Sequence, residues 1–492
     1  MARKNKLTQS EIDGVQYRRS KTWQIALAQM CNGSAMIFYS LMTLLSYLAN
    51  AGYGMVMGIA GVLLTVTRVF DGLIDPLISL MIDRVNTRFG KIRVFLLLGW
   101  AIRSVAALAL FVWFSGKGHG IVLFVAVYLL YIIGTSIQDI AGNMLPAVMS
   151  NDPKQRPVIS VWSTVYSYLF PMILSVVSTM IILPMYGNQY TAEMLSYLCL
   201  LYIPISLVLL VISCIGVSGM DKPELFQSIT ATGEEDKVKP RDMWELVKSN
   251  RPFQRYIVSA VSDKLAQQTV SQSIVSTLLF GIAIGNIQFG TMLSIISMLP
   301  AIVFAIIGAK HAGRAGNKEV TVLWTKVSII IAALSVVFCG VIDMRQISSN
   351  FIFTAIFFVL LLAMSGAKMC ITTANGAMRA DIIDYELDRS GKYLPAVVTA
   401  TYNFIDQFVS SLGATIAAVG VSLIGYTTTA PQPTDAPTPA IKWMALFLYY
   451  GMPILGWICT LVAMKGYHLD KKEMVEVQKR IVDKKEAILK NE

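Results

Sequence analysis

Long apolar runs alternate with short, mostly basic segments along this chain of 492 residues. Twelve runs are long enough for an α-helix to cross the hydrocarbon core of a bilayer, which takes about 20 residues. We expect spans at 23–49, 54–82, 93–114, 120–149, 157–185, 192–218, 253–284, 288–309, 319–342, 350–378, 394–427 and 440–465. The pattern therefore predicts an all-α membrane protein with 12 transmembrane helices.

A polar segment at 219–252 separates the predicted spans into two groups of six, at 23–218 and 253–465. The second span of each group is followed by a short basic loop, at 83–91 and at 310–318. Such an echo between two halves is typical of transporters built from structural repeats. We expect two related six-helix bundles joined by a linker.

The two ends of the chain lack membrane-spanning character. Segment 1–22 is charged and has no apolar core of the kind found in a cleaved signal peptide. Segment 466–492 has apolar residues at Met474, Val477 and Ile481, which is a helical spacing. We expect it to form an amphipathic helix beside the membrane.

The positions of lysine and arginine predict the orientation of the chain. The N-terminal segment and the alternate loops are rich in both residues, whereas the opposite loops hold little beyond Lys117, Arg345 and Lys442. Because basic loops stay in the cytoplasm, we expect both termini there, in a multi-pass protein of the plasma (inner) membrane. The net charge of +11 is the sum of this bias, so it requires no nucleic-acid partner.

The second predicted span carries three charges on one stripe. Arg68, Asp71 and Asp75 are spaced i, i+3 and i+7, and Pro76 deprives the carbonyl of Gly72 of its helical partner. Charges inside a bilayer cost about 2.5–3.5 kcal/mol or more each, so a function has to justify them. Two readings fit: an oxygen-rich site for a proton or a small cation such as Na⁺ at the two aspartates, or an ion-pair network that holds helices together.

Ionisable residues from five predicted spans lie at a similar depth, about 12–18 Å from the end of each span at 1.5 Å per residue. They are Asp71, Asp75, Asp139, Lys264, Lys368 and Asp406. Transporters bind substrate near the midplane between repeats, so this layer predicts the transport site. Lys264 and Lys368 have an alternative reading, in which each snorkels or pairs with an aspartate. Arg103 and Lys326 lie nearer the span ends, and we expect them to snorkel.

Polar and aromatic side chains complete this layer. They are Asn32, Ser34, Ser136, Asn143, Trp162, Tyr166, Gln267, Asn375, Tyr402, Asn403 and Gln407. Carboxylates and amides bind hydroxyl groups, and aromatic rings cover the C–H face of a sugar. The combination favours a sugar-like substrate, although each aromatic residue taken alone is equally explained by packing.

Four segments together resemble the glycoside–pentoside–hexuronide:cation symporter family of the major facilitator superfamily, the melibiose permease type. They are Arg68-Val-Phe-Asp71-Gly-Leu-Ile-Asp75-Pro76, Thr87-Arg88-Phe-Gly90-Lys91, Asp139 with Pro146 and Asp152, and Asp381-Ile-Ile-Asp384-Tyr385-Glu386. The resemblance runs over nearly the whole chain. It implies the major facilitator fold, with two pseudo-symmetric six-helix bundles, alternating access and cation-coupled uptake.

The resemblance also implies roles for particular residues. Asp71 and Asp75 take the place of the cation-site carboxylates, Ser136 that of a hydroxyl ligand, and Asp139 that of the sugar-binding aspartate. The residues expected in the cytoplasmic gating loops are Asp83, Arg84, Arg88, Gly90, Lys91, Arg156, Asp381, Asp384 and Glu386.

Several family positions differ in this chain. Ile74 replaces an asparagine before Asp75, which removes a neutral oxygen ligand and favours H⁺ over Na⁺. The family's acid on the first helix, arginine on the fifth and lysine on the eleventh are also absent. Lys264 and Lys368 are candidates for the missing cationic groups, and two lysines at that depth would tolerate an anionic sugar such as a uronide.

We therefore expect a monomeric, cation-coupled symporter that imports a sugar, glycoside or hexuronide and needs no cofactor beyond the coupling ion, H⁺ or Na⁺. A lysolipid or other organic-solute carrier of the same fold is the alternative within transport. A membrane sensor or scaffold is the alternative outside it. No nucleophile motif or metal-ligand spacing points to an enzyme.

Overall fold

The computed structural model describes residues 19–84, 89–118, 120–150, 156–221, 240–391, 395–477 and 479–481. Within these residues the chain is helical and contains no β-strand, so the predicted all-α class is confirmed. Nine helices in the described part are long and apolar enough to cross a membrane, and a pair bent by 119° would make ten. The number twelve stays a prediction.

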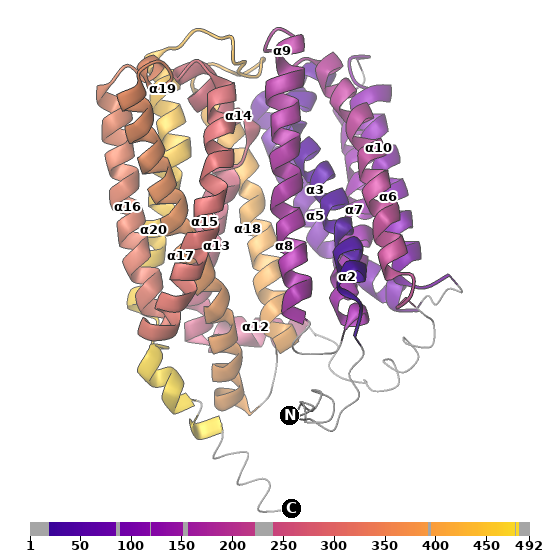
Figure 1. Ribbon diagram of the computed structural model, residues 1–492, viewed down its shortest axis with the longest axis vertical. Coiled ribbons are helices and arrows are strands. Elements are labelled where there is room, and N and C mark those ends of the chain that lie inside the picture. The colour runs from indigo at the N-terminus through magenta and orange to yellow at the C-terminus, as the bar shows by residue number, and fades with distance from the viewer. Residues whose placement is uncertain are drawn as a thin grey trace, which may run out of the picture. The chain divides into compact units, whose positions relative to one another are not determined.

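The helices up to the predicted linker follow the predicted spans closely (Figure 1). They are α2 Thr22–Ala28, α3 Met30–Met42, α4 Leu45–Tyr47, α5 Met57–Arg84, α6 Ile92–Leu108, α7 Ile121–Met149, α8 Arg156–Val176, α9 Leu183–Met185 and α10 Ala192–Val217. π-Helical segments extend three of these spans, at η1 Leu48–Gly52, η2 Ala109–Trp113 and η3 Val177–Ile182.

The later helices begin with the short amphipathic α12 Pro240–Ser249, inside the predicted linker. They continue as α13 Arg251–Val270, α14 Ser273–Ser276, η4 Thr277–Ala283, α15 Ile287–Ala315, α16 Asn317–Val341, η5 Met344–Ile347, α17 Phe351–Ser390, α18 Pro395–Leu423, α19 Pro439–Leu446, η6 Phe447–Gly451 and α20 Met452–Lys465. Residues 471–477 and 479–481 are helical too, where the terminal amphipathic helix was expected.

Side-chain caps fix where several later helices begin. Asn250, Asn286, Asn350 and Thr438 each accept a hydrogen bond from a backbone N–H in the first turn of α13, α15, α17 and α19. Such a cap is worth about 0.5–2 kcal/mol. Gly391 ends α17 in the left-handed region at φ 69°, which glycine adopts without steric cost.

The chain divides into two compact units. The first contains Met1–Leu45, Leu73–Ser178 and Ala192–Glu235, and the second contains Ser46–Gly72, Thr179–Thr191 and Asp236–Glu492. The simple division at 219–252 that we expected from the sequence stays a prediction.

In the first unit, α6 and α7 pack at very short range because glycines face each other across the crossing. A Cβ atom on Gly99 would lie 2.6 Å from the backbone nitrogen of Gln138, and one on Gly134 would lie 2.6 Å from that of Arg103. No larger residue fits without moving a backbone. The crossing brings the polar side chains of Arg103 and Gln138 within reach of each other.

In the second unit, α13 is a central helix that packs against α18 and α20. The contact with α20 is close at Gly456, where a Cβ atom would lie 2.8 Å from the carbonyl oxygen of Ser262. This close approach places Trp457, the next residue on α20, against the polar face of α13. That face carries Asp263 and Gln267.

Candidate functional site

Three of the predicted substrate-binding residues line one cavity in the first unit. The cavity measures about 240 Å³ and lies between α3, α6 and α7. Asn32 contributes from α3, while Asp139 and Asn143 follow each other by one turn on α7. Both α7 side chains are exposed. The cavity therefore presents a carboxylate and two amides to an incoming molecule.

Asn32 is held in place by its own helix. Its side-chain nitrogen donates to the Gln29 side-chain oxygen at 2.7 Å and to the Gln29 backbone carbonyl at 3.3 Å. Because the amide nitrogen is engaged in this way, the amide oxygen of Asn32 is the group available to accept a hydrogen bond. Ser34, two residues later, is fully buried and does not line the cavity.

The expected cation site is described only in part. Asp75 is half-buried on α5, and Ser136 is buried on α7, one turn before Asp139. Arg68 and Asp71 also lie on α5, but their side chains are outside the described part of the structure. A proton or Na⁺ site at Asp71 and Asp75 stays a prediction.

Trp162 and Tyr166 lie on α8 and form part of an aromatic row. Their ring centroids are 5.6 Å apart, and Tyr166 lies 5.9 Å from Phe170. Tyr166 is buried, and Trp162 packs against the hydrophobic core of the first unit. Neither lines the cavity around Asp139, and a substrate-binding role for the two side chains stays a prediction.

The expectation that Arg103 snorkels is wrong. The side chain is only 4% exposed and donates to the Tyr131 hydroxyl at 2.9 Å and to the Gln138 side-chain oxygen at 3.3 Å. Its guanidinium also lies 4.5 Å from the ring centroid of Phe38. Gln138 lines the cavity beside Asp139, so this buried cation lies directly behind the site. The sequence did hold a signal for this buried arginine. Tyr131 and Gln138 are seven residues apart, so they lie on one face of α7 and offer two polar partners.

A second polar centre, in the second unit, surrounds a residue absent from the expected site. Asp263 on α13 is 6% exposed and accepts hydrogen bonds from Trp457 Nε1 at 3.1 Å and Gln267 Nε2 at 2.8 Å. The Lys368 ammonium, from α17, lies 5.8 Å from the centroid of the Trp457 ring. We call Asp263, Gln267, Lys368 and Trp457 the Asp263 centre.

The other expected residues of the second unit lie on α13 and α18. Asp406 is half-buried, and its Oδ1 has no hydrogen-bond partner among the described residues. Lys264 and Gln407 are half-buried, and Asn403 is exposed. Arg379 stacks on Tyr402 at 4.0 Å from the ring centroid, one turn before Asp406. The expected residues are thus spread along these two helices.

A buried carboxylate anchors the loop before α6. The side chain of Asp221, at the start of the predicted linker, accepts hydrogen bonds from the backbone nitrogens of Lys91, Ile92 and Arg93 at 2.9, 3.2 and 3.0 Å. Gly90 adopts φ 95°, and a Cβ atom there would collide with Asp221. Two expected gating residues, Gly90 and Lys91, are therefore fixed by a residue that the sequence reading missed.

A second carboxylate ties α17 to the beginning of α13. Glu386 is 3% exposed and accepts a hydrogen bond from the Asn250 side chain at 2.7 Å. Arg389 donates to both of its oxygens, at 2.8 and 3.1 Å. Asn250 in turn caps α13, so one acid links the end of α17 to the beginning of α13.

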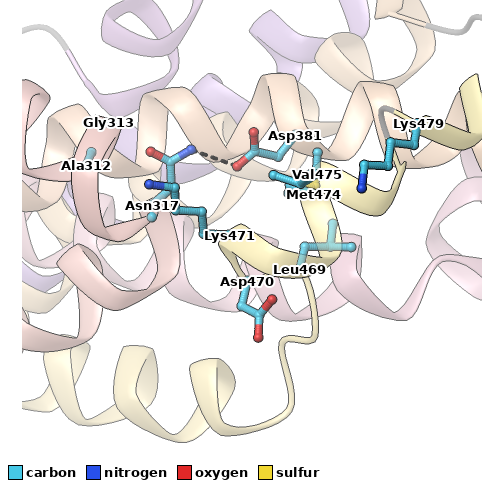
Figure 2. A pocket seen from close by; sticks show the side chains of 11 residues that line it. Ala312, Gly313, Asn317, Asp381, Leu469, Asp470, Lys471, Met474, Val475 and Lys479 are labelled. Atoms are coloured by element: carbon cyan, nitrogen blue, oxygen red, sulfur yellow. Dashed lines mark hydrogen bonds between the residues drawn. The ribbon is translucent and has the colours of Figure 1, made fainter. Parts of the chain in front are cut away.

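Asp381 opens onto a cavity of about 570 Å³ in the second unit (Figure 2). It accepts a hydrogen bond from the Asn317 side chain at 2.7 Å. The opposite wall is the terminal segment, where Lys471 donates to the carbonyl oxygen of Arg314. Asp384 is half-buried. Among the remaining expected gating residues, Arg88 and the side chains of Asp83, Arg84 and Arg156 lie outside the described part.

Comparison with known proteins shows consistent similarities. Residues 25–471 match the family described as MFS/sugar transport protein. The putative glycoside/cation symporter YagG of Escherichia coli strain K12 is 21% identical, with 92% of each chain covered. The isoprimeverose transporter of Lactiplantibacillus pentosus is 23% identical over 90% of this chain and 87% of the relative. A lactose permease of Lactobacillus delbrueckii is 35% identical, over only 30% of this chain and 24% of the relative.

Solved structures of low identity share the fold. The nucleoside transporter NupG superposes with a TM-score of 0.59 at 15% identity, covering 90% of this chain and 99% of that protein. A bacterial homologue of the human lysosomal transporter Spinster gives a TM-score of 0.57 at 13% identity, covering 92% and 97%.

Proposed function

The chain belongs to the MFS/sugar transport protein family, and from this premise we propose that it moves a sugar or sugar derivative together with H⁺ or Na⁺ by alternating access. The family confirms the resemblance seen in the sequence motifs, and with it the major facilitator fold. The protein is a membrane transporter and not an enzyme.

The cavity around Asp139 is the observation that carries the substrate assignment. Asp139, Asn32 and Asn143 offer a carboxylate, which accepts hydrogen bonds, and amides, which accept and donate them. A sugar is a dense array of hydroxyl groups that both donate and accept. A lysolipid would instead require a long apolar channel, and the described lining of this cavity supplies four polar side chains. We therefore place hydroxyl recognition here.

The coupling ion is assigned by the number of oxygen ligands. Na⁺ needs several oxygens once it leaves water, whereas a proton needs a single carboxylate. Ile74 precedes Asp75 and offers no side-chain oxygen. We propose H⁺ as the coupling ion, carried by Asp75 and Asp71 with Ser136 nearby on α7, in a monomer whose termini both face the cytoplasm.

Uptake into proteoliposomes tests this function. The purified protein is reconstituted, and uptake of radiolabelled methyl β-D-glucoside, methyl β-D-glucuronide and a lysolipid is compared, each with a pH gradient, with a Na⁺ gradient and with neither. We expect a sugar to accumulate under the pH gradient alone. Accumulation of the lysolipid only, or of a sugar only with Na⁺, would contradict the substrate or the ion assignment respectively. A lack of transport for every solute would favour the sensor reading.

A further inference from the structure

The carboxylate at the Asp263 centre is buried and held by neutral donors. Trp457 donates to Oδ1 and Gln267 donates to Oδ2, so each oxygen has one partner and neither partner carries a charge. These two bonds match the ionised carboxylate. When one oxygen takes up a proton, the other still accepts from Trp457, and the Gln267 amide can turn so that its oxygen accepts from the new O–H group. Whether Asp263 is ionised or protonated therefore depends on the charges around it.

Lys368 supplies the main positive charge, but it does not touch Asp263. Both residues are close to the Trp457 indole, whose N–H is bonded to Asp263 and whose ring centroid lies 5.8 Å from the Lys368 ammonium. Among the described residues, no acceptor lies within hydrogen-bonding distance of that ammonium, and no ion pair joins it to an acid. A half-buried ammonium without an acceptor among the described residues is a binding group for an anion.

The other elements packed against α13 bring few further charges to the centre. Lys264 is the next residue on α13 and acts on Asp263 from the same helix. From α18, Asp406 faces Lys264 and Arg379, and Tyr402 faces Arg379. Tyr256, on α13 itself, also faces Arg379. α20 presents Trp457, which carries no charge. Lys368 is thus the charge that a bound ligand can take away from Asp263.

We propose that Asp263 is a proton-binding site that loads when an anionic group of the substrate engages Lys368. The anion forms an ion pair with the ammonium, and Asp263 loses the larger of the two positive charges that balanced it, so that only the smaller influence of Lys264 remains. A buried carboxylate without a compensating charge is strongly disfavoured relative to its neutral form. A proton from water then forms an O–H bond with one oxygen of Asp263, so charge is conserved within the centre. This inference rests on the proposed transport function and adds to it a proton that only acidic substrates bring.

Proton uptake on ligand binding tests the proposal without any gradient. Purified full-length protein in detergent is placed near neutral pH in weak buffer with a pH-indicator dye. Methyl β-D-glucuronide or methyl β-D-glucoside is then added, and calorimetry measures how much of each binds. We expect the glucuronide to bind with an uptake of about one proton per site beyond that seen with the glucoside.

Two variants and a control variant test which side chains cause the excess proton uptake. Asp263→Asn keeps an oxygen acceptor for Trp457 and should abolish the excess proton uptake. Lys368→Gln should abolish it too, since Asp263 would already be neutral before ligand arrives. Lys326→Gln changes an exposed lysine of α16 and should leave the excess unchanged. Size-exclusion chromatography checks that each variant is folded.

Three results would overturn the proposal. They are an unchanged proton excess in both Asp263→Asn and Lys368→Gln, no excess in the wild type despite binding of the glucuronide, and no binding of the glucuronide at all. Transport of a neutral sugar in proteoliposomes would leave the proposed function standing in each case. Conversely, the wild-type protein could transport no solute and still show the excess proton uptake. That result would contradict the proposed transport function and support the proton-binding site at Asp263.

Discussion

Asp139 in the first unit and Asp263 in the second are aspartates on long helices, yet they lie in opposite surroundings. Asp139 is exposed and shares its cavity with the amides of Asn32 and Asn143. Asp263 is 6% exposed and is enclosed by Trp457 and Gln267. The first can remain charged in contact with solvent and ligand, whereas the second depends on a neighbouring cation.

The basic residues of the two regions, Arg103 and Lys368, differ in how many partners they bind. Behind the first cavity, Arg103 is held by hydrogen bonds to Tyr131 and Gln138 and lies over the ring of Phe38. At the Asp263 centre, Lys368 lies near the ring of Trp457 and has no hydrogen bond to a described residue. A guanidinium held by two hydrogen bonds stiffens the wall of a site, whereas an ammonium without such bonds can take a new partner. This contrast suggests one region that recognises hydroxyl groups and another that responds to charge.

The largest effect is expected outside both regions, at Asp75. If Asp75 carries the coupling ion, Asp75→Asn should abolish accumulation against a gradient while sugar exchange across the membrane continues. Counterflow and pH-driven uptake in proteoliposomes separate the two activities. Intact pH-driven accumulation in this variant and in Asp71→Asn would remove the cation-site assignment. The Asp263 centre would then be the remaining candidate for coupling.

The comparison also shows what a sequence can predict. Apolar runs gave helix ends within a few residues, as for 192–218 against Ala192–Val217 and 120–149 against Ile121–Met149. The predicted span 350–378 was too short, because α17 continues to Ser390 as a polar extension that hydropathy does not detect. The span 253–284 is interrupted after α13, at Ser271 and Gln272.

Side-chain partnerships were much harder to predict. Asp263 and Trp457 are 194 positions apart, and only the close packing of α13 and α20 at Gly456 brings them together. The contact between Asp221 and the loop at Gly90 likewise depends on tertiary structure. The shared cavity of Asp139, Asn32 and Asn143 was easier to anticipate, because depth in the membrane and spacing along a helix already constrain their positions.

The second-largest effect is expected at the first cavity. Asp139→Ala leaves substrate hydroxyls without their acceptor, at a cost of about 1–3 kcal/mol. That corresponds to a loss of affinity of roughly 5- to 150-fold. Calorimetry should find this loss to be similar for methyl β-D-glucoside and methyl β-D-glucuronide, because both present the same ring hydroxyls. Wild-type affinity for both sugars would move the substrate site away from this cavity.

The smallest and most selective effect is expected at Lys368. Lys368→Gln removes the ammonium that we assign to an anionic group, so the glucuronide should lose affinity severalfold more than the glucoside. The single variant also leaves Asp263 without its balancing cation, which has its own cost. The double variant Lys368→Gln, Asp263→Asn strands neither charge and should recover part of the transport of the glucoside. Equal losses for the two sugars, with no recovery in the double variant, would make Lys368 a packing residue. The Asp263 centre would then be a structural network only, and the cavity around Asp139 alone would account for substrate recognition.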